Sequence, residues 1–172
     1  SPPDLPTMKD RADAVNGDLT VYDNIINTYG RAFMVYGGAL LGSLTLSNNT
    51  ILTTPDANFP YVIDFSGSEV SSGASLIIKN NISGFTSIAS DGYYLLTPGK
   101  INGSLIIDNN LYYNSTRTKP FDLQGTNLSF VDWKDYNYDS HSLNNIDPKF
   151  NNYSGSYSQD IDFEIPSKSP AV

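Results

Sequence analysis

A short sequence recurs four times along this chain, at residues 18–25, 43–50, 75–82 and 104–111. Each copy has apolar residues at alternate positions, followed by a polar pair whose second member is asparagine. These asparagines (Asn24, Asn49, Asn81 and Asn110) are 25, 32 and 29 residues apart. A repeat of this length that carries one short apolar strand indicates a solenoid of stacked coils rather than an ordinary globular sheet.

Alternation within the recurring strand predicts which side chains face the interior of the stack. The inward pairs are Leu19/Val21, Leu44/Leu46, Leu76/Ile78 and Leu105/Ile107. Because equivalent positions stack from coil to coil, we expect aliphatic ladders inside. At the corner we expect an asparagine ladder, in which side-chain amides form hydrogen bonds between coils.

A second apolar segment follows each asparagine corner, at residues 32–36, 61–65, 93–96 and 121–123, and a glycine comes soon after it. These glycines are Gly37, Gly67, Gly99 and Gly125. Glycine tolerates positive φ and suits a sharp corner. One coil is therefore predicted to run strand, asparagine corner, loop, strand, glycine corner.

The chain of 172 residues is long enough for one domain with a real core. We expect an extended segment at residues 1–17, coils at 18–133 with a last full strand at 128–133, and a terminal tail at 134–172 that covers the end of the stack. The segment at 1–17 does not resemble an amphipathic cap, so we expect this domain to be part of a longer protein.

Composition excludes several partners. The net charge of −8 argues against nucleic acid and anionic membrane surfaces. No apolar run approaches 18 residues, so no membrane insertion is expected. Cysteine is absent, which excludes disulfides and thiolate sites. Abundant Asn, Ser, Thr, Gly and Tyr with scarce Lys and Glu favour an all-β protein that is secreted or lies at the cell surface.

Residues 128–172 carry a more specific resemblance. Their residues and spacing resemble the C-terminal end of secreted right-handed parallel β-helix proteins of the pectate-lyase-like superfamily. The residues that carry this resemblance are Trp133, Asp139 to Ser142, Asp147 to Phe150, Asp162-Phe163 and Ser169 to Ala171. That superfamily includes polysaccharide lyases, pectinases, alginate-modifying enzymes and phage tailspikes. The resemblance implies an all-β, right-handed, single-stranded parallel β-helix of about five coils with an irregular C-terminal tail.

The resemblance implies a polysaccharide partner and a function in processing an extracellular glycan, as a polysaccharide lyase or hydrolase. A non-catalytic module is the alternative: an adhesin, a glycan-binding solenoid or part of a phage spike. A purely structural surface protein is a third. Contacts with the rest of a parent chain, or a homo-oligomer, are further expectations.

Lyases of this type pair a Lys or Arg base with an acidic groove that often holds calcium. Lys79 and Arg31 are therefore the catalytic candidates, and Asp108 is the candidate metal ligand. Lys79 and Asp108 are expected to be neighbours on consecutive coils, so a surface ion pair is the simpler interpretation. No calcium-binding motif is present. The cofactor expectation is accordingly none, or Ca²⁺.

Substrate contacts are assigned to tyrosines and to basic side chains in loops. The candidates are Tyr93, Tyr94, Tyr112, Tyr113, Lys100 and Arg117. Exposed tyrosines stack on sugar faces, whereas buried ones fill the coils. Asp64 and Asp122, two coils apart and thus about 10 Å from each other, form a weaker candidate pair for hydrolysis. His141, the only histidine, is expected in a structural turn.

Overall fold

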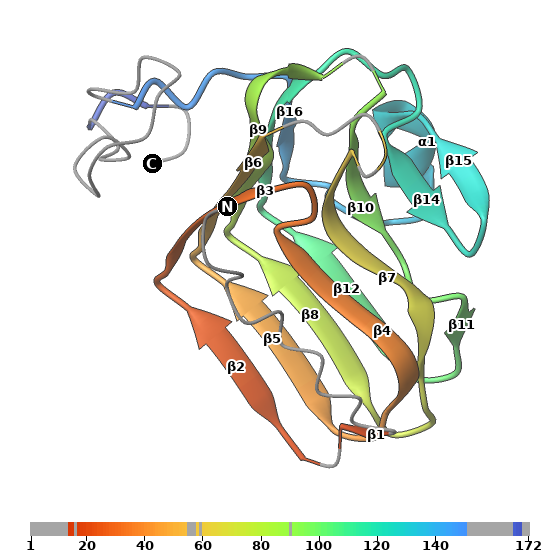
Figure 1. Ribbon diagram of the computed structural model, residues 1–172. Coiled ribbons are helices and arrows are strands. Elements are labelled where there is room, and N and C mark those ends of the chain that lie inside the picture. Colours follow the sequence, from red (N-terminus) through yellow and green to blue (C-terminus); the bar gives the residue numbers. More distant parts are fainter. Residues whose placement is uncertain are drawn as a thin grey trace.

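The computed structural model describes residues 14–15, 17–54, 58, 60–89, 91–150 and 167–169. Most of the extended segment expected at 1–17, and most of the tail beyond residue 150, lies outside the described residues. The chain forms an all-β parallel solenoid of about four turns, so the fold class expected from the repeat is confirmed. Equivalent strands of successive coils lie side by side (Figure 1).

Three sheets run along the stack. Sheet A contains β1 (Ala14–Val15), β4 (Phe33–Leu40), β7 (Tyr61–Val70), β10 (Tyr93–Leu96), β14 (Phe121–Leu123) and β15 (Thr126–Leu128), with β11 (Lys100–Ile101) beside β7. Sheet B contains β2 (Leu19–Tyr22), β5 (Ser43–Ser47), β8 (Ser75–Lys79) and β12 (Ser104–Asp108). Sheet C contains β3 (Ile25–Tyr29), β6 (Thr50–Thr54), β9 (Ile82–Ala89), β13 (Leu111–Ser115) and β16 (Leu143–Asn144).

Each full coil thus has three strands, one more than the sequence pattern predicted. The missing strand, in sheet C, begins directly after the asparagine corner, where a loop was expected. The corner itself is only two residues long, and its first residue has a φ of 55–57° in all four coils (Asp23, Asn48, Asn80 and Asn109). Asn and Asp tolerate this left-handed conformation better than other residues with a side chain, which explains the recurring polar pair.

The aliphatic ladders of sheet B are confirmed in the middle of the stack. Leu44 pairs with Leu76, which pairs with Leu105; Leu46, Ile78 and Ile107 align in the same way. All of these are buried except Leu105, which is half-buried. The equivalent residue of the first coil, Leu19, is 47% exposed because β2 is the outermost strand of its sheet.

The expected glycine corners are correct only in part. Gly125, with a φ of 86°, turns the chain between the antiparallel strands β14 and β15. Gly37 and Gly67 instead lie inside β4 and β7, where the pairing register shifts. Gly67 has no positive φ, but a Cβ at this position would overlap the ring of Tyr36. The small residue is required by that close approach.

The expected last full strand at 128–133 is wrong. The antiparallel strand β15 ends at Leu128, and helix α1 (Phe130–Asp135) follows. Ser129 caps this helix by accepting a hydrogen bond from the N–H of Asp132, and Asp132 caps Ser129 in return. This hairpin and helix replace a fifth coil, so the stack has about four coils instead of the expected five. No helix in the described part of the chain is long and apolar enough to cross a membrane.

Candidate functional site

The catalytic and metal candidates Lys79 and Asp108 lie on sheet B as neighbours on consecutive coils, as expected. The ion pair between them is not formed. Asp108 instead accepts hydrogen bonds from the N–H of His141 (2.9 Å, Oδ1) and pairs with Nδ1 of His141 (2.8 Å, Oδ2). Partial burial acts to raise the pKa of Asp108, but the hydrogen bonds from His141 and Asn109 outweigh it and lower that pKa.

A calcium site at Asp108 finds no support among the residues that the structure describes. No group of three or more His, Asp or Glu side chains within those ranges is arranged to hold a metal ion. The expected turn at His141 is present, and its ring holds the terminal segment against the last strand of sheet B through Asp108.

The second catalytic candidate, Arg31, is engaged in a structural ion pair. Its Nε lies 3.2 Å from Oδ2 of Asp64, whose side chain is buried. The guanidinium also stacks over Tyr61, 5.2 Å from the ring centre. Oδ1 of Asp64 accepts hydrogen bonds from the N–H (2.9 Å) and the hydroxyl (2.6 Å) of Ser66. A buried carboxylate needs such a partner, so Arg31 stabilises Asp64 and is poorly placed to act as a base.

The hydrolytic pair Asp64 and Asp122 has the expected register, since both pair with Leu96 of the coil between them. Both side chains are buried. Asp122 accepts a hydrogen bond of 2.9 Å from the N–H of Gly125 and so fixes the β14–β15 turn. The two carboxylates are therefore used in the fold and do not face an open groove together.

Two of the four tyrosines expected to contact sugar are core residues. Tyr94 and Tyr112 are 0% and 1% exposed. The hydroxyl of Tyr94 donates to Oδ1 of Asn145 (2.7 Å), and that of Tyr112 donates to Oδ2 of Asp139 (2.7 Å). Burial raises the pKa of both hydroxyl groups. Tyr113 is half-buried, and its pKa is also raised by burial.

Tyr93 and Arg117 do lie together, beside a shallow pocket formed with Asp91, Thr116, Thr118, Lys119 and Asn127. The guanidinium carbon of Arg117 lies 3.8 Å from the ring centre of Tyr93, and the guanidinium also donates to the tyrosine hydroxyl. Arg117 has further contacts with Asp91 (3.7 Å) and with the carbonyl of Lys119 (3.0 Å). These contacts hold the guanidinium of Arg117 in place against Tyr93.

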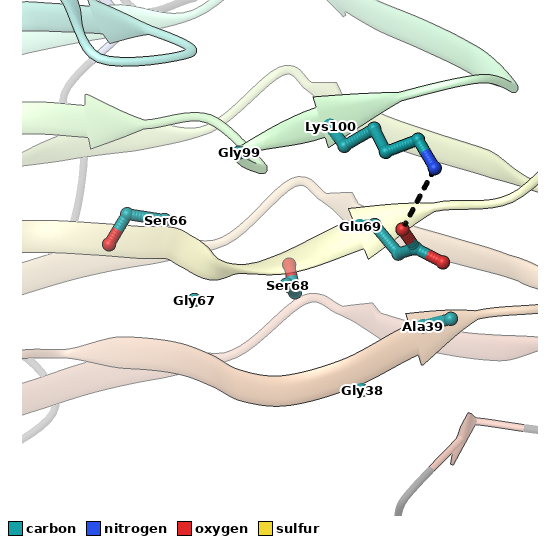
Figure 2. Close-up of a pocket in the computed structure, with 8 residues that line it drawn as sticks. All are labelled: Gly38, Ala39, Ser66, Gly67, Ser68, Glu69, Gly99 and Lys100. Atoms are coloured by element: carbon teal, nitrogen blue, oxygen red, sulfur yellow. Dashed lines mark ion pairs between the residues drawn. The ribbon is translucent and has the colours of Figure 1, made fainter.

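An open groove of about 550 Å³ crosses the outer face of sheet A (Figure 2). Its lining comes from β4, β7 and the segment around β11: Gly38, Ala39, Ser66, Gly67, Ser68, Glu69, Gly99 and Lys100. The N–H of Gly99 donates to the carbonyl of Ser68 (3.0 Å), which joins two coils along the groove floor. Glycine and serine leave the backbone uncovered, and this produces the hollow.

Charged groups lie at one end of this groove and a serine hydroxyl lies at the other. Nζ of Lys100 is 3.7 Å from Oε2 of Glu69, and both side chains remain in contact with solvent. Figure 2 shows this pair and Ser66 at opposite ends of the lining. Of the six predicted substrate-binding residues, Lys100 is therefore the one that lies in the groove.

Tyr36 borders the groove and was not among the candidates. Its ring lies against Gly67, which is its Cα partner in the next coil, and the side chain is 70% exposed. In the structure, residues 33–36 alternate between half-buried and exposed positions. The sequence held no signal for this, because residues 33–36 (Phe-Met-Val-Tyr) show no alternation of apolar and polar residues. Phe33 and Val35 face inward, so Tyr36 faces outward.

No family model matches the sequence, and no curated protein or solved structure matches it. Fold and site together define the molecule as a parallel β-solenoid with an open groove across one outer sheet.

Proposed function

We propose that this chain is a carbohydrate-binding β-solenoid, and that the groove lined by Gly38, Gly67 and Gly99 holds a neutral oligosaccharide. The observation that carries the proposal is the exposed ring of Tyr36, held against Gly67 beside the groove. Apolar faces of sugar rings stack on aromatic rings of this kind. The groove runs across successive coils, which suits an extended chain of sugars.

The polar lining supports the same ligand. The hydroxyl of Ser66 donates to Oδ1 of Asp64 (2.6 Å) and keeps lone pairs that can accept a hydrogen bond from a sugar. The hydroxyl of Ser68 is buried and donates to the carbonyl of Phe65 (2.8 Å). Lys100 and Glu69 carry opposite charges that offset each other. A few polar groups of this kind orient a ligand in a pocket, while the absence of excess positive charge in the lining favours neutral sugars over polyanions. A secreted location and membership of the pectate-lyase-like superfamily belong to this proposal.

Lyase-like processing in the same groove is the second candidate, and one observation favours it. Lys100 is a possible base that lies beside a carboxylate, Glu69, within the groove. Lys79 is on a different sheet, and Arg31 is paired with Asp64. A lyase reaction at this site would therefore depend on Lys100.

The test is glycan-array screening followed by titration calorimetry with the oligosaccharides that bind. We expect Tyr36→Ala to weaken binding about tenfold, since loss of an aromatic contact costs on the order of 1 kcal/mol or more. Tyr29→Ala is the matched control, because Tyr29 is 72% exposed and lies in β3, away from the groove. An equal effect of the two substitutions, or no glycan that binds, would contradict the proposal.

The same preparation separates binding from processing. Incubation with anionic polysaccharides, first with calcium and then with a chelator, is followed by ultraviolet absorbance of an unsaturated product. Product formation that Lys100→Ala abolishes would establish the second candidate instead. Binding without product supports the recognition module.

A further inference from the structure

The asparagine ladder is directional, and this direction makes the two ends of the stack chemically different. Oδ1 of Asn49 accepts hydrogen bonds from the N–H and the Nδ2 of Asn24, each at 3.1 Å. Oδ1 of Asn81 accepts the same two bonds from Asn49, and Oδ1 of Asn110 accepts them from Asn81. All three steps therefore run in one direction: the asparagine of one coil donates, and the asparagine of the next coil accepts.

Asn24 begins this ladder with an open acceptor. Within the described part of the chain no group donates to its Oδ1, and its side chain is exposed, whereas Asn49, Asn81 and Asn110 are buried. Nδ2 of Asn49 also reaches back to the carbonyl of Val21 in the preceding coil (2.9 Å). Nδ2 of Asn24 instead donates to the carbonyl of Tyr22 within its own coil (2.7 Å).

The two strands that flank Asn24, β2 and β3, lie at the same end of the stack. β2 and β3 are the outermost strands of sheets B and C, so one edge of each has no described strand beside it. Leu19, Tyr22, Ile25 and Tyr29 are 47%, 59%, 43% and 72% exposed. Leu44, the Cα partner of Leu19 in the next coil, is 1% exposed. The exposed leucine thus occupies a position that is covered in the interior of the stack. An open, apolar strand edge of this type is a template for strand addition.

The opposite end of the ladder is closed. The hydroxyl of Ser142 accepts the N–H of Asn110 (2.7 Å), and Oδ1 of Asp139 accepts its Nδ2 (3.0 Å). Ser142 thereby takes the place that asparagine holds in the other coils. A second copy of this chain cannot supply the missing donors from that end, because they are already used.

We propose that the surface formed by β2, β3 and Asn24 binds one further parallel β-coil from another polypeptide segment. The segment it fits has apolar residues at alternate positions, a residue that tolerates positive φ, and then an asparagine. That asparagine donates its N–H and Nδ2 to Oδ1 of Asn24. This proposal does not depend on the groove or on sugar binding.

The test uses a synthetic peptide with the sequence of residues 43–54, which form β5, the corner and β6. It is titrated into the ¹⁵N-labelled full chain and followed by two-dimensional NMR. We expect chemical-shift changes only in the amides of residues 19–29. The peptide should lie beside β2 and β3 in the same way that β5 and β6 lie beside β8 and β9. A peptide carrying Asn49→Ala loses one hydrogen bond and should bind about fivefold more weakly.

Substitutions in the protein complete the test. Asn24→Ala should reduce affinity for the unsubstituted peptide by at least fivefold, since it removes the acceptor. Asn102→Ala is the matched control at an exposed asparagine in another part of the stack. The proposal is overturned if millimolar peptide causes no chemical-shift changes, or if the two peptides bind equally.

Discussion

At the scale of single residues, the ladder depends on a side chain that donates and accepts at once. Asn81 illustrates this best. Its Nδ2 donates to the carbonyls of Leu46 and Lys79, each at 3.0 Å, and to Oδ1 of Asn110, while its own Oδ1 accepts from Asn49. Because these groups are buried, each depends on its partner in the ladder rather than on water.

Asn81→Ala should lower the free energy of unfolding by about 1–3 kcal/mol, because it leaves the buried N–H of Asn49 without an acceptor. Urea denaturation measures this. Asn24→Ala serves as the comparison, since Asn24 is exposed and water can replace its partners. Equal losses in the two variants would show that the ladder adds nothing beyond an ordinary surface hydrogen bond.

At the scale of elements, α1 covers the end of the stack although it has only six residues. Such a short helix is unstable alone. Its hydrogen-bonded cap and its single buried residue, Trp133, hold it in place. The indole stacks on Phe121 with ring centres 5.1 Å apart, and its Nε1 donates to Asp139 (2.7 Å).

Ser129→Ala should destabilise the protein by about 0.5–2 kcal/mol, because the N–H of Asp132 loses the serine hydroxyl that caps it. Thermal unfolding monitored by tryptophan fluorescence reports directly on α1, since Trp133 is the only tryptophan. Ser87→Ala, at an exposed serine in β9, is the control. Equal melting temperatures for the Ser129→Ala and Ser87→Ala variants would contradict the role assigned to the cap.

At the scale of the whole molecule, Asp139 joins the ladder, the core and the terminal helix. Its fully buried carboxylate accepts hydrogen bonds from Asn110, Tyr112, Trp133 and Ser142. Burial raises the pKa of Asp139 and outweighs these four hydrogen bonds, which act to lower it. The closure of the stack is therefore linked to pH.

A raised pKa means that the folded protein binds this proton more tightly than the unfolded chain. The contribution of Asp139 to stability is thus fully present below its ordinary pKa of 3.8 and is lost as pH rises through its folded-state pKa. Asp139→Asn removes this dependence and places an amide N–H₂ against the indole N–H or another donor.

We expect Asp139→Asn to be less stable than the unsubstituted protein at every pH, with a difference that narrows as pH rises. Urea unfolding of both proteins between pH 3 and pH 7 measures the difference. A difference that widened toward neutral pH would mean that the four hydrogen bonds outweigh burial, and that the pKa is lowered.

Local signals along the chain were sufficient to predict the stacking. The spacing of Asn24, Asn49, Asn81 and Asn110 and the alternation at positions such as Leu76 and Ile78 predicted coils, inward ladders and the asparagine corner. Each of these features depends on residues that repeat along the chain, because equivalent residues of successive coils lie next to each other in the stack. Ser129 and Asp132 also form a local capping signal, which points to a helix where the apolar pattern at 128–133 predicts a strand.

Which side chains are available for function depends on contacts between coils. Tyr94 and Tyr112 lie in the core while Tyr36 lies at the surface, and Arg31 meets Asp64 from the adjacent coil. Composition and spacing do not distinguish these cases, because a tyrosine suits both environments and an ion pair depends on how neighbouring coils align. The repeat along the chain is enough to specify a stacked solenoid with an asparagine ladder. The groove on sheet A and the closed end at Asp139 arise from packing between segments far apart in the chain.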